Sequence, residues 1–540
     1  MSEATAASPI FDRGRSGYVR DFNTLDVFIF NVIGFSLGLA LSTNPSFIGS
    51  FAPSANIIIV LALGAVLAFF NGLTYGWFGG IMPSTGGDYI FVGRSLSHRF
   101  GFLTSWGFTA CQIYGLALNL GFILSVGIAP ALLTLGVSMN NQSLIDIGFS
   151  LGRPDHVAIG STLLLVLYFL LAYFELGLNR VVIYLAFVFA LLGPILMIYT
   201  LFGHTHAEFV AAFNAFMQKL KGVPNAYDVV IGTARQNNIT VDPKAMWHAS
   251  LQAVPLGFLC FLGFTYSVYV GGEVREPQKS QVRGILSALL IGILVFILGM
   301  GQYVNVVSQE FHSAIGFPPV LEKLGLTANS LNFFTGILAV HPVVNLVMQV
   351  GNLLWFLLIP YVMIQVCTHN LIAWTCDRMM PEGLLARAGT ANTPWRAFLA
   401  ICVAVLLCIA ANYFFGFTLV GAVALAAVAF CLTGISAAYL PAERPDVFAG
   451  ARGMMRRKFL GVTLFQLVGI IGAAGFSWVI FAAVWYPDIS GGTPARAIVV
   501  LIVVYITGLI VYEVNKAKLQ RRIESVGVNL DALFKEIPKD

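Results

Sequence analysis

The sequence has few charged residues for its length. Only 10% of its 540 residues are Asp, Glu, Lys or Arg, whereas 58% are hydrophobic. Soluble chains carry roughly a quarter charged residues. A chain this apolar cannot cover its surface with its own polar side chains, so the composition predicts a protein that spans a lipid bilayer.

Several chemical motifs are absent as well. The seven cysteines include no CxxC pair and lie in or beside apolar runs, which favours buried thiols over a disulfide framework or a zinc site. There is no Walker A sequence and no Ser/His/Asp or Cys/His set assignable to one depth. We therefore expect neither an enzyme nor a cofactor or metal site. The first 20 residues lack a signal-peptide pattern, so the first apolar run is expected to remain in the mature protein.

Apolar runs that are long enough to cross a bilayer, about 20 residues, recur along the chain. Twelve such runs predict twelve membrane helices at 24–47, 54–80, 100–135, 157–177, 180–203, 248–272, 281–308, 342–375, 394–412, 414–440, 459–486 and 494–514. The long connections 204–247 and 309–341 mix polar and apolar residues. They predict short amphipathic helices over the outer face, which either cover a vestibule or act as ordinary loops.

The basic residues are unevenly distributed between the two sides of these spans. With the N-terminus inside, 23 of the 30 Lys and Arg residues fall in inner segments and seven in outer ones. This bias is the positive-inside pattern, and it places both termini in the cytoplasm. The basic clusters flank spans and have no interleaved aromatic residues, so no nucleic-acid interface is expected.

The middle depths of the spans contain no charged residue. Asp26, Glu175, Glu273 and Asp377 all fall near predicted inner ends, which excludes a midplane carboxylate relay and an Arg-rich voltage sensor. Polar uncharged residues remain within the spans. Each of them either belongs to a functional site or makes a hydrogen bond between helices. They include Gln112, Tyr114, Asn119, Asn345, Gln349, Asn352, Gln365 and Thr368.

Two spans are interrupted by helix-loosening residues. "NVIGFSLGLALSTNP" (31–45) lies in the first span, and "GFLCFLGFTYSVYVGGEVREP" (257–277) lies in the sixth. Paired breaks in corresponding positions of two halves indicate an inverted-repeat transporter. A broken helix frees backbone N–H and C=O groups, which can hold the carboxylate and the ammonium of a zwitterion. Glycines that act as packing notches are the alternative explanation.

Five stretches together resemble the amino acid–polyamine–organocation (APC) superfamily, and its amino acid permeases in particular. They are the first interruption with Gly38, Leu39 and Ala40, then "MPSTGGDY" (82–89), "FLGF…GGEVREP", "CDRMMPEGLL" (376–385) and "NTPWRA". Their order and spacing are specific, although each stretch alone is weak. The likeness covers about residues 20–450.

The resemblance implies the five-plus-five inverted repeat of the bacterial leucine transporter, in an all-α membrane protein with broken helices 1 and 6. The implied divisions are a cytoplasmic tail (1–22), repeat 1 (23–203), an extracellular segment (204–247), repeat 2 (248–440), two extra helices (459–514) and a cytoplasmic tail (515–540).

The resemblance also implies a substrate site and an ion site. Amides around Gly38, Leu39 and Ala40 would bind a carboxylate, and carbonyls between Asn31 and Gly34 and around Phe261 and Leu262 would take the ammonium or an ion. Phe261 and Phe264 would be gating aromatics. The implied substrate-binding set is Gly34, Gly38, Leu39, Ala40, Phe261, Leu262, Gly263, Phe264, Gln112, Tyr114 and Met363, and the candidate ion ligands are Ile33 and Thr368.

The sequence departs from the family pattern in three places. Ala40 replaces the second glycine of the first interruption, although its N–H remains. Span 5 lacks the lysine that some members carry, which argues against proton coupling through that group. His369 stands near the inner end of span 8, either as a titrating group or as a hydrogen-bonded packing residue.

We therefore predict a secondary active transporter of amino acids in the cell membrane that works by alternating access. Its predicted partners are a neutral amino acid, either apolar or small, a coupling ion (sodium or proton) and membrane lipid. Two alternatives stay open: a transporter of polyamines, other organocations or inorganic cations, and a transporter-like amino acid sensor.

Overall fold

The computed structural model describes residues 20–174, 180–326, 329–339, 341–385, 394–416, 420–486, 489, 494–524 and 534–536. Within these ranges, eleven helical segments are long and apolar enough to cross a membrane. They are formed by α1 (Thr24–Phe35) with α2 (Leu37–Phe51), α3 (Ile57–Ile81), α5 (His98–Phe122) with the π-helical η2 (Ile123–Ile128) and α6 (Ala129–Ser138), α8 (Pro154–Tyr173), α9 (Arg180–Phe202), α14 (Pro277–Val307), α18 (Pro342–Cys376), α19 (Trp395–Phe415), α20 (Val420–Glu443), α22 (Leu464–Trp485) and α23 (Pro494–Glu524).

The predicted span 248–272 is the one that does not form a long helix in the described chain. It is divided among α12 (Met246–Gln252), α13 (Val254–Leu259), and the 3₁₀ turns η3 (Tyr266–Val268) and η4 (Gly271–Glu273). The sequence predicted a membrane segment with a glycine-rich interruption here. α13 ends at Leu259, and Gly263 adopts φ +113°, a conformation that favours glycine.

Span boundaries differ from the predictions mainly at the ends. The first span continues to Phe51 and begins at a capping box, in which Asn23 and Asp26 satisfy each other's backbone N–H groups. The last span was predicted to end at 514 but continues to Glu524, because Lys and Arg are good helix formers that extend a helix into water. Residues 175–177, the end of the fourth predicted span, lie outside the described residues.

The spans pack in a regular order. α1 contacts η3 of the interrupted sixth segment, α3 packs along α14, α5 along α18 and α8 along α19. Each of these four partners lies five predicted spans further along the chain. α9 also packs on α18, and α20 packs along α22. The eight polar interior residues named from the sequence therefore lie on two helices that pack on each other, α5 and α18.

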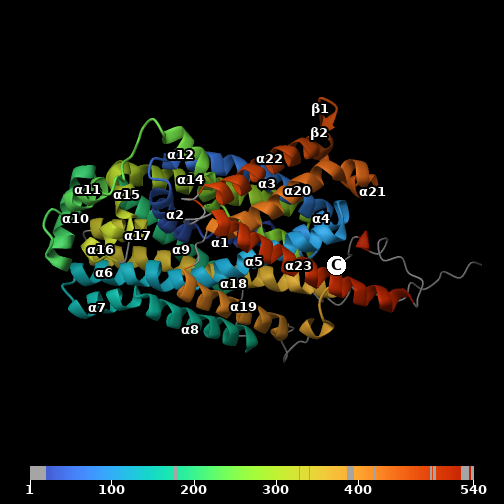
Figure 1. Ribbon diagram of the computed structural model, residues 1–540, viewed down its shortest axis with the longest axis horizontal. Helices are drawn as coiled ribbons and strands as arrows, with labels where there is room; N and C mark the ends of the chain where they lie inside the picture. The colour runs from blue at the N-terminus through green and yellow to red at the C-terminus, as the bar shows by residue number, and fades with distance from the viewer. Residues whose placement is uncertain are drawn as a thin grey trace, which may run out of the picture.

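The two long connections form short helices at one end of the bundle, as predicted (Figure 1). Phe209 and Phe213 from the first connection pack against Phe311 and Phe334 from the second, so the two connections form one cover. The helices are α10 (His206–Lys221), α11 (Ala226–Gln236), α15 (Gln309–Ile315), α16 (Pro318–Leu324) and α17 (Leu331–Leu338), with α7 (Gln142–Leu151) nearby.

The opposite end of the bundle carries the C-terminus and several short elements (Figure 1). They are α4 (Asp88–Ser95), η5 (Glu382–Leu385), α21 (Pro445–Phe448), η6 (Gly453–Arg456) and the hairpin of β1 (Lys458–Phe459) and β2 (Val462–Thr463). Leu460 and Gly461 both have positive φ, which is typical of a two-residue hairpin turn. The hairpin projects sideways beyond α22 (Figure 1).

Candidate functional site

The first helix break is a single residue. Ser36 separates α1 from α2 with φ 47° and ψ 77°, and its N–H donates to the carbonyl of Ile33 at 3.0 Å. Its hydroxyl donates to the carbonyl of Trp355 on α18 at 3.1 Å. Leu37, Gly38 and Leu39 are the first three residues of α2, and the first N–H groups of an α-helix have no acceptor within their own helix. The start of α2 is thus a helix N-terminus inside the bundle.

Ala40 differs from the other members of the predicted carboxylate site. Its N–H donates to the carbonyl of Ser36 at 2.8 Å, because this is the first regular hydrogen bond of α2. The N–H of Ala40 is therefore already occupied, whereas Gly38 and Leu39 precede this bond in the first turn of α2. The sequence shows that residue 40 keeps a backbone N–H. It does not show that α2 resumes early enough to use this N–H in its own first hydrogen bond.

The second break lies directly against the first. A Cβ on Gly34 would lie 2.5 Å from the carbonyl oxygen of Gly263, and a Cβ on Gly263 would in turn collide with the carbonyl oxygen of Gly34. Two hydrogen bonds also join the two interrupted segments. Asn31 Nδ2 donates to Ser267 Oγ at 3.0 Å, and the N–H of Ser267 donates to Asn31 Oδ1 at 2.9 Å. Ser267 also bonds Gln281 on α14. The two interruptions and α14 are therefore joined.

Gly38 faces α18 rather than open space. A Cβ at this position would lie 2.5 Å from Asn352 Oδ1 and would collide with the Trp355 ring. Both neighbours are held: Asn352 Nδ2 donates to Ser42 Oγ at 3.0 Å, and Trp355 Nε1 donates to the Ala190 carbonyl at 2.7 Å. Gly38 thus permits the close approach of α2 and α18, and the carboxylate role rests on its N–H alone.

The predicted wall residues separate into two groups. Gln112 of α5 accepts a hydrogen bond from the Tyr266 hydroxyl of η3, and its Nε2 is buried without a partner among the described residues. Met363 of α18 packs on α5, where its methyl carbon would lie 2.9 Å from a Cβ on Gly115. Gln112, Tyr266 and Met363 therefore line the junction of α5, α18 and the second break. Tyr114 is two positions from Gln112 and so lies on another face of α5.

The aromatic residues of the second break are packed against neighbouring helices. The Phe261 ring lies 5.4 Å from Phe296 of α14, which also contacts Phe35 at 6.0 Å. The Phe264 ring would lie 2.9 Å from a Cβ on Gly72 of α3. Leu262, between them, is half-buried. In this conformation the predicted gating rings are part of the packing around the break.

A cavity of about 530 Å³ leads toward the breaks from the end of the bundle that carries the C-terminus. Its inner wall includes Ile33, a candidate ion ligand, one residue before Gly34. Its mouth is charged: Arg180 contacts Asp26 at 3.2 Å, and the Tyr184 hydroxyl donates to Asp26 at 2.5 Å. The cavity therefore connects an aqueous, charged surface with the first interruption.

Glu273 and His369 form a polar pair at the same end. Glu273 lines the cavity, and its Oε1 lies 2.8 Å from His369 Nε2, while His369 Nδ1 lies 2.7 Å from the Gln365 carbonyl. Since both ring nitrogens face oxygen acceptors, a proton must lie between His369 and Glu273, on the ring or on the carboxyl. Thr368, the other candidate ion ligand, is the preceding buried residue of α18.

Asp88 and the C-terminal segment were not singled out from the sequence. Asp88 is fully buried at the start of α4, where Tyr269 Oη donates to its Oδ2 at 2.9 Å. Burial raises the pKa of this carboxyl from 3.8 to about 7. The only sequence signal was its place in "MPSTGGDY", which was used as a family motif and not as a titratable site.

A residue of the C-terminal segment takes part in a buried charge cluster at this end. Arg94 of α4 pairs with Asp377 at 2.7 Å and donates through Nε to the Glu536 carbonyl at 2.8 Å. The Phe534 ring stacks on His98 with centroids 3.5 Å apart. Sequence patterns do not reveal this docking, because it joins residues more than 400 positions apart.

The fold and the paired breaks define a multi-pass α-helical membrane protein built around two interrupted segments. Residues 27–524 match the sequence model of the amino acid permease family, and the chain belongs to this family. Proteins of this family are transporters rather than enzymes. The family match confirms the resemblance stated from the motifs and the expectation that the protein is not an enzyme.

Individual relatives are distant. The chain is 22% identical to a branched-chain amino acid permease of Lactococcus lactis over 53% of this chain and 56% of the relative. It is 23% identical to an uncharacterised transporter of Mycobacterium tuberculosis over 65% of each chain. It is 29% identical to an uncharacterised protein of Sulfolobus islandicus rod-shaped virus 1 over 24% of this chain and 30% of the relative. In each case the match spans less than two thirds of the relative.

Proposed function

We propose that the protein is a secondary active transporter of amino acids that works by alternating access. The observation that carries this proposal is the backbone contact between the two interruptions at Gly34 and Gly263. It brings two sets of broken-helix ends to one place inside the bundle. Such a site can bind a zwitterion without any charged side chain.

The polarity of the helix ends supports the binding mode. The N–H groups of Gly38 and Leu39 lie in the first turn of α2, where the helix dipole attracts a carboxylate. The end of α1 and the carbonyls around Phe261 and Leu262 present the opposite polarity, which suits an ammonium group. Ile33 and Thr368 are the proposed ligands of a coupling sodium ion, and a proton is the alternative coupling ion.

The packing order supports the proposed repeat. Spans 1 to 4 each contact the span five positions later, as expected when two halves of five helices are related by an axis in the membrane plane. We propose residues 23–203 and 248–440 as the two repeats, with 459–514 as two added helices and twelve spans in all. We place the protein in the cell membrane with both termini cytoplasmic and the 530 Å³ cavity opening inward.

A neutral substrate fits the surroundings of the breaks. Gln112, Tyr266 and Met363 supply an amide, a phenol and a thioether, and none of them is an acid that would favour a cationic side chain. The relative from Lactococcus lactis is a branched-chain amino acid permease. We therefore propose neutral amino acids, including branched-chain ones, as the substrate class.

The test is uptake by proteoliposomes that contain the purified full-length protein, with labelled amino acids offered singly. We expect uptake and exchange of neutral amino acids, and competition by unlabelled leucine or valine. Movement of polyamines or potassium with no amino acid uptake would overturn the substrate class. Amino acid binding without flux or exchange would indicate a sensor instead.

A further inference from the structure

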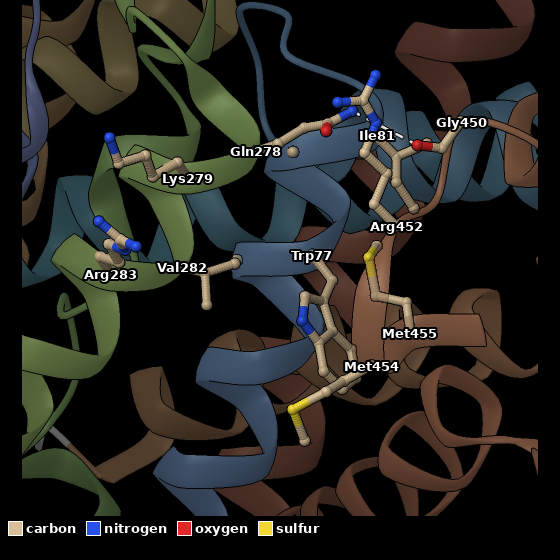
Figure 2. A pocket seen from close by; sticks show the side chains of 12 residues that line it. Trp77, Ile81, Gln278, Lys279, Val282, Arg283, Gly450, Arg452, Met454 and Met455 are labelled. Carbon is tan, nitrogen blue, oxygen red and sulfur yellow. Dashed lines mark hydrogen bonds between the residues drawn. The ribbon is translucent and has the colours of Figure 1, made fainter. Parts of the chain in front are cut away.

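We propose that a cavity between α3, the start of α14 and residues 450–455 binds the phosphate headgroup of an anionic phospholipid. The cavity has a volume of about 380 Å³, within the range of roughly 300–1,000 Å³ found for ligand sites. It is separate from the cavity that leads to the helix breaks, and the proposal does not depend on the substrate. Figure 2 shows the side chains that line it.

Three cationic side chains surround this cavity. Lys279 and Arg283 lie one helical turn apart on α14, and Arg452 reaches it from the segment before η6. Arg283 and Arg452 have no carboxylate within ion-pair distance in the described part of the chain, and Lys279 lies 3.4 Å from the exposed Glu276. The cavity thus carries net positive charge, and the N-terminal end of the 31-residue α14 adds to it.

The remaining walls are apolar. Trp77 and Ile81 line the cavity from α3, and Met454 and Met455 from η6 (Figure 2). Met454 is 58% exposed, although the cavity that it lines also contains three cationic residues. Such a mixture suits a ligand with an anionic head and an apolar body, because a free anion gains nothing from thioether and indole walls. This chemistry favours a phospholipid over inorganic phosphate.

The position of the cavity also matches a lipid interface. It lies where the apolar α3 ends and the apolar α14 begins, so it is at the boundary of the spans. The neighbouring hairpin carries Lys458 and exposes Phe459 and Leu460, the latter by 88%. Basic residues beside exposed apolar ones are typical of segments that lie on an anionic membrane surface. A lipid bound here would bridge span 2, span 7 and the segment that precedes η6.

The test measures lipid binding by the purified full-length protein in neutral detergent, using native mass spectrometry and thermal unfolding. Phosphatidylglycerol is compared with phosphatidylcholine and with inorganic phosphate. The double variant Arg283→Gln/Arg452→Gln should bind phosphatidylglycerol roughly 30-fold more weakly, about fivefold for each basic residue removed. It should also lose the thermal stabilisation that this lipid gives to the unmodified protein.

Two further variants separate charge from folding. Arg283→Lys/Arg452→Lys should retain most of the lipid binding, because it keeps both charges. Arg521→Gln removes an exposed arginine of α23 at the same end of the bundle and should bind like the unmodified protein. Unchanged lipid binding by the glutamine double variant would overturn the proposal. So would equal stabilisation by inorganic phosphate, or equal binding of phosphatidylcholine.

Discussion

Gly34 and Gly263 are in backbone contact, although 229 positions separate them in the sequence. Neither position has room for a Cβ: on Gly34 it would lie 2.5 Å from the Gly263 carbonyl oxygen, and on Gly263 it would collide with the Gly34 carbonyl oxygen. The two interrupted segments thus meet at glycines that cannot be enlarged without moving the main chain. Both the proposed binding site and the packing of the bundle depend on this contact.

Gly34→Ala tests the contact directly. The added Cβ meets backbone atoms that cannot rotate away, so we expect a loss of about 1–3 kcal/mol of stability and at least a tenfold lower rate of amino acid uptake. Gly232→Ala is the matched control. Gly232 lies in α11 with no atom within 4 Å of the added Cβ, so alanine there should be neutral or slightly stabilising. Normal uptake by Gly34→Ala would show that the contact is not needed.

Gly38→Leu should abolish uptake while the protein still inserts into the membrane. The leucine side chain would push α2 away from Asn352 and Trp355 of α18, and the N–H groups at the start of α2 would move with it. Ser36→Ala removes one hydrogen bond to the Trp355 carbonyl, worth about 1 kcal/mol, and should retain most uptake. Uptake by Gly38→Leu equal to that of the unmodified protein would place the site elsewhere.

Asp88→Asn should change how stability depends on pH. Burial raises the pKa of Asp88 from 3.8 to about 7, so the folded state favours the protonated carboxyl. The stability that this group contributes is fully present below pH 3.8 and is lost as the pH rises toward about 7. We expect the melting temperature of the unmodified protein to fall relative to Asp88→Asn between pH 5 and pH 7. Parallel melting curves across this range would refute the assignment.

Phe534→Ala tests the docking of the C-terminal segment. The Phe534 ring is 2% exposed and stacks on His98, and losing a buried Phe side chain costs about 3 kcal/mol or more. The variant should unfold at a lower temperature, and proteases should cleave the tail faster. Lys535→Ala removes an exposed side chain and keeps the carbonyl that Arg444 binds, so it should behave like the unmodified protein. Identical melting of both variants would show that the ring does not anchor the tail.

Much of the fold follows from hydropathy and composition. Long apolar runs predicted eleven of the long helices because lipid requires continuous backbone hydrogen bonding, which a helix supplies within itself. The mixed pattern of the two long connections predicted their short helices. The segment 248–272 is equally apolar, and its interruption was predicted from its glycines rather than from hydropathy. Hydropathy measures transfer to lipid and does not register the backbone conformation of a single glycine.

The candidate site was predictable in its location and less so in its contacts. The glycines at 34, 38 and 263 were recognised, but a sequence cannot distinguish an unwound backbone from a close helix crossing. Gly38 permits a close approach to α18 and also lies in the first turn of α2. Tyr266 was missed because the aromatic residues on either side of Gly263 were the obvious candidates. Its contact with Gln112 joins segments 154 positions apart, which no local pattern encodes.

The hydrogen bonds of Ser267 have a mechanical consequence. Because Ser267 joins Asn31 of α1 to Gln281 of α14, the first half of span 1, the turn after the second break and the start of α14 are linked by hydrogen bonds. The cavity at Ile33 lies between this linked group and residues of α9 and α18. Widening the cavity therefore requires the linked group to move relative to these two helices, and an engineered cross-link between α1 and α9 should hold it at a fixed aperture.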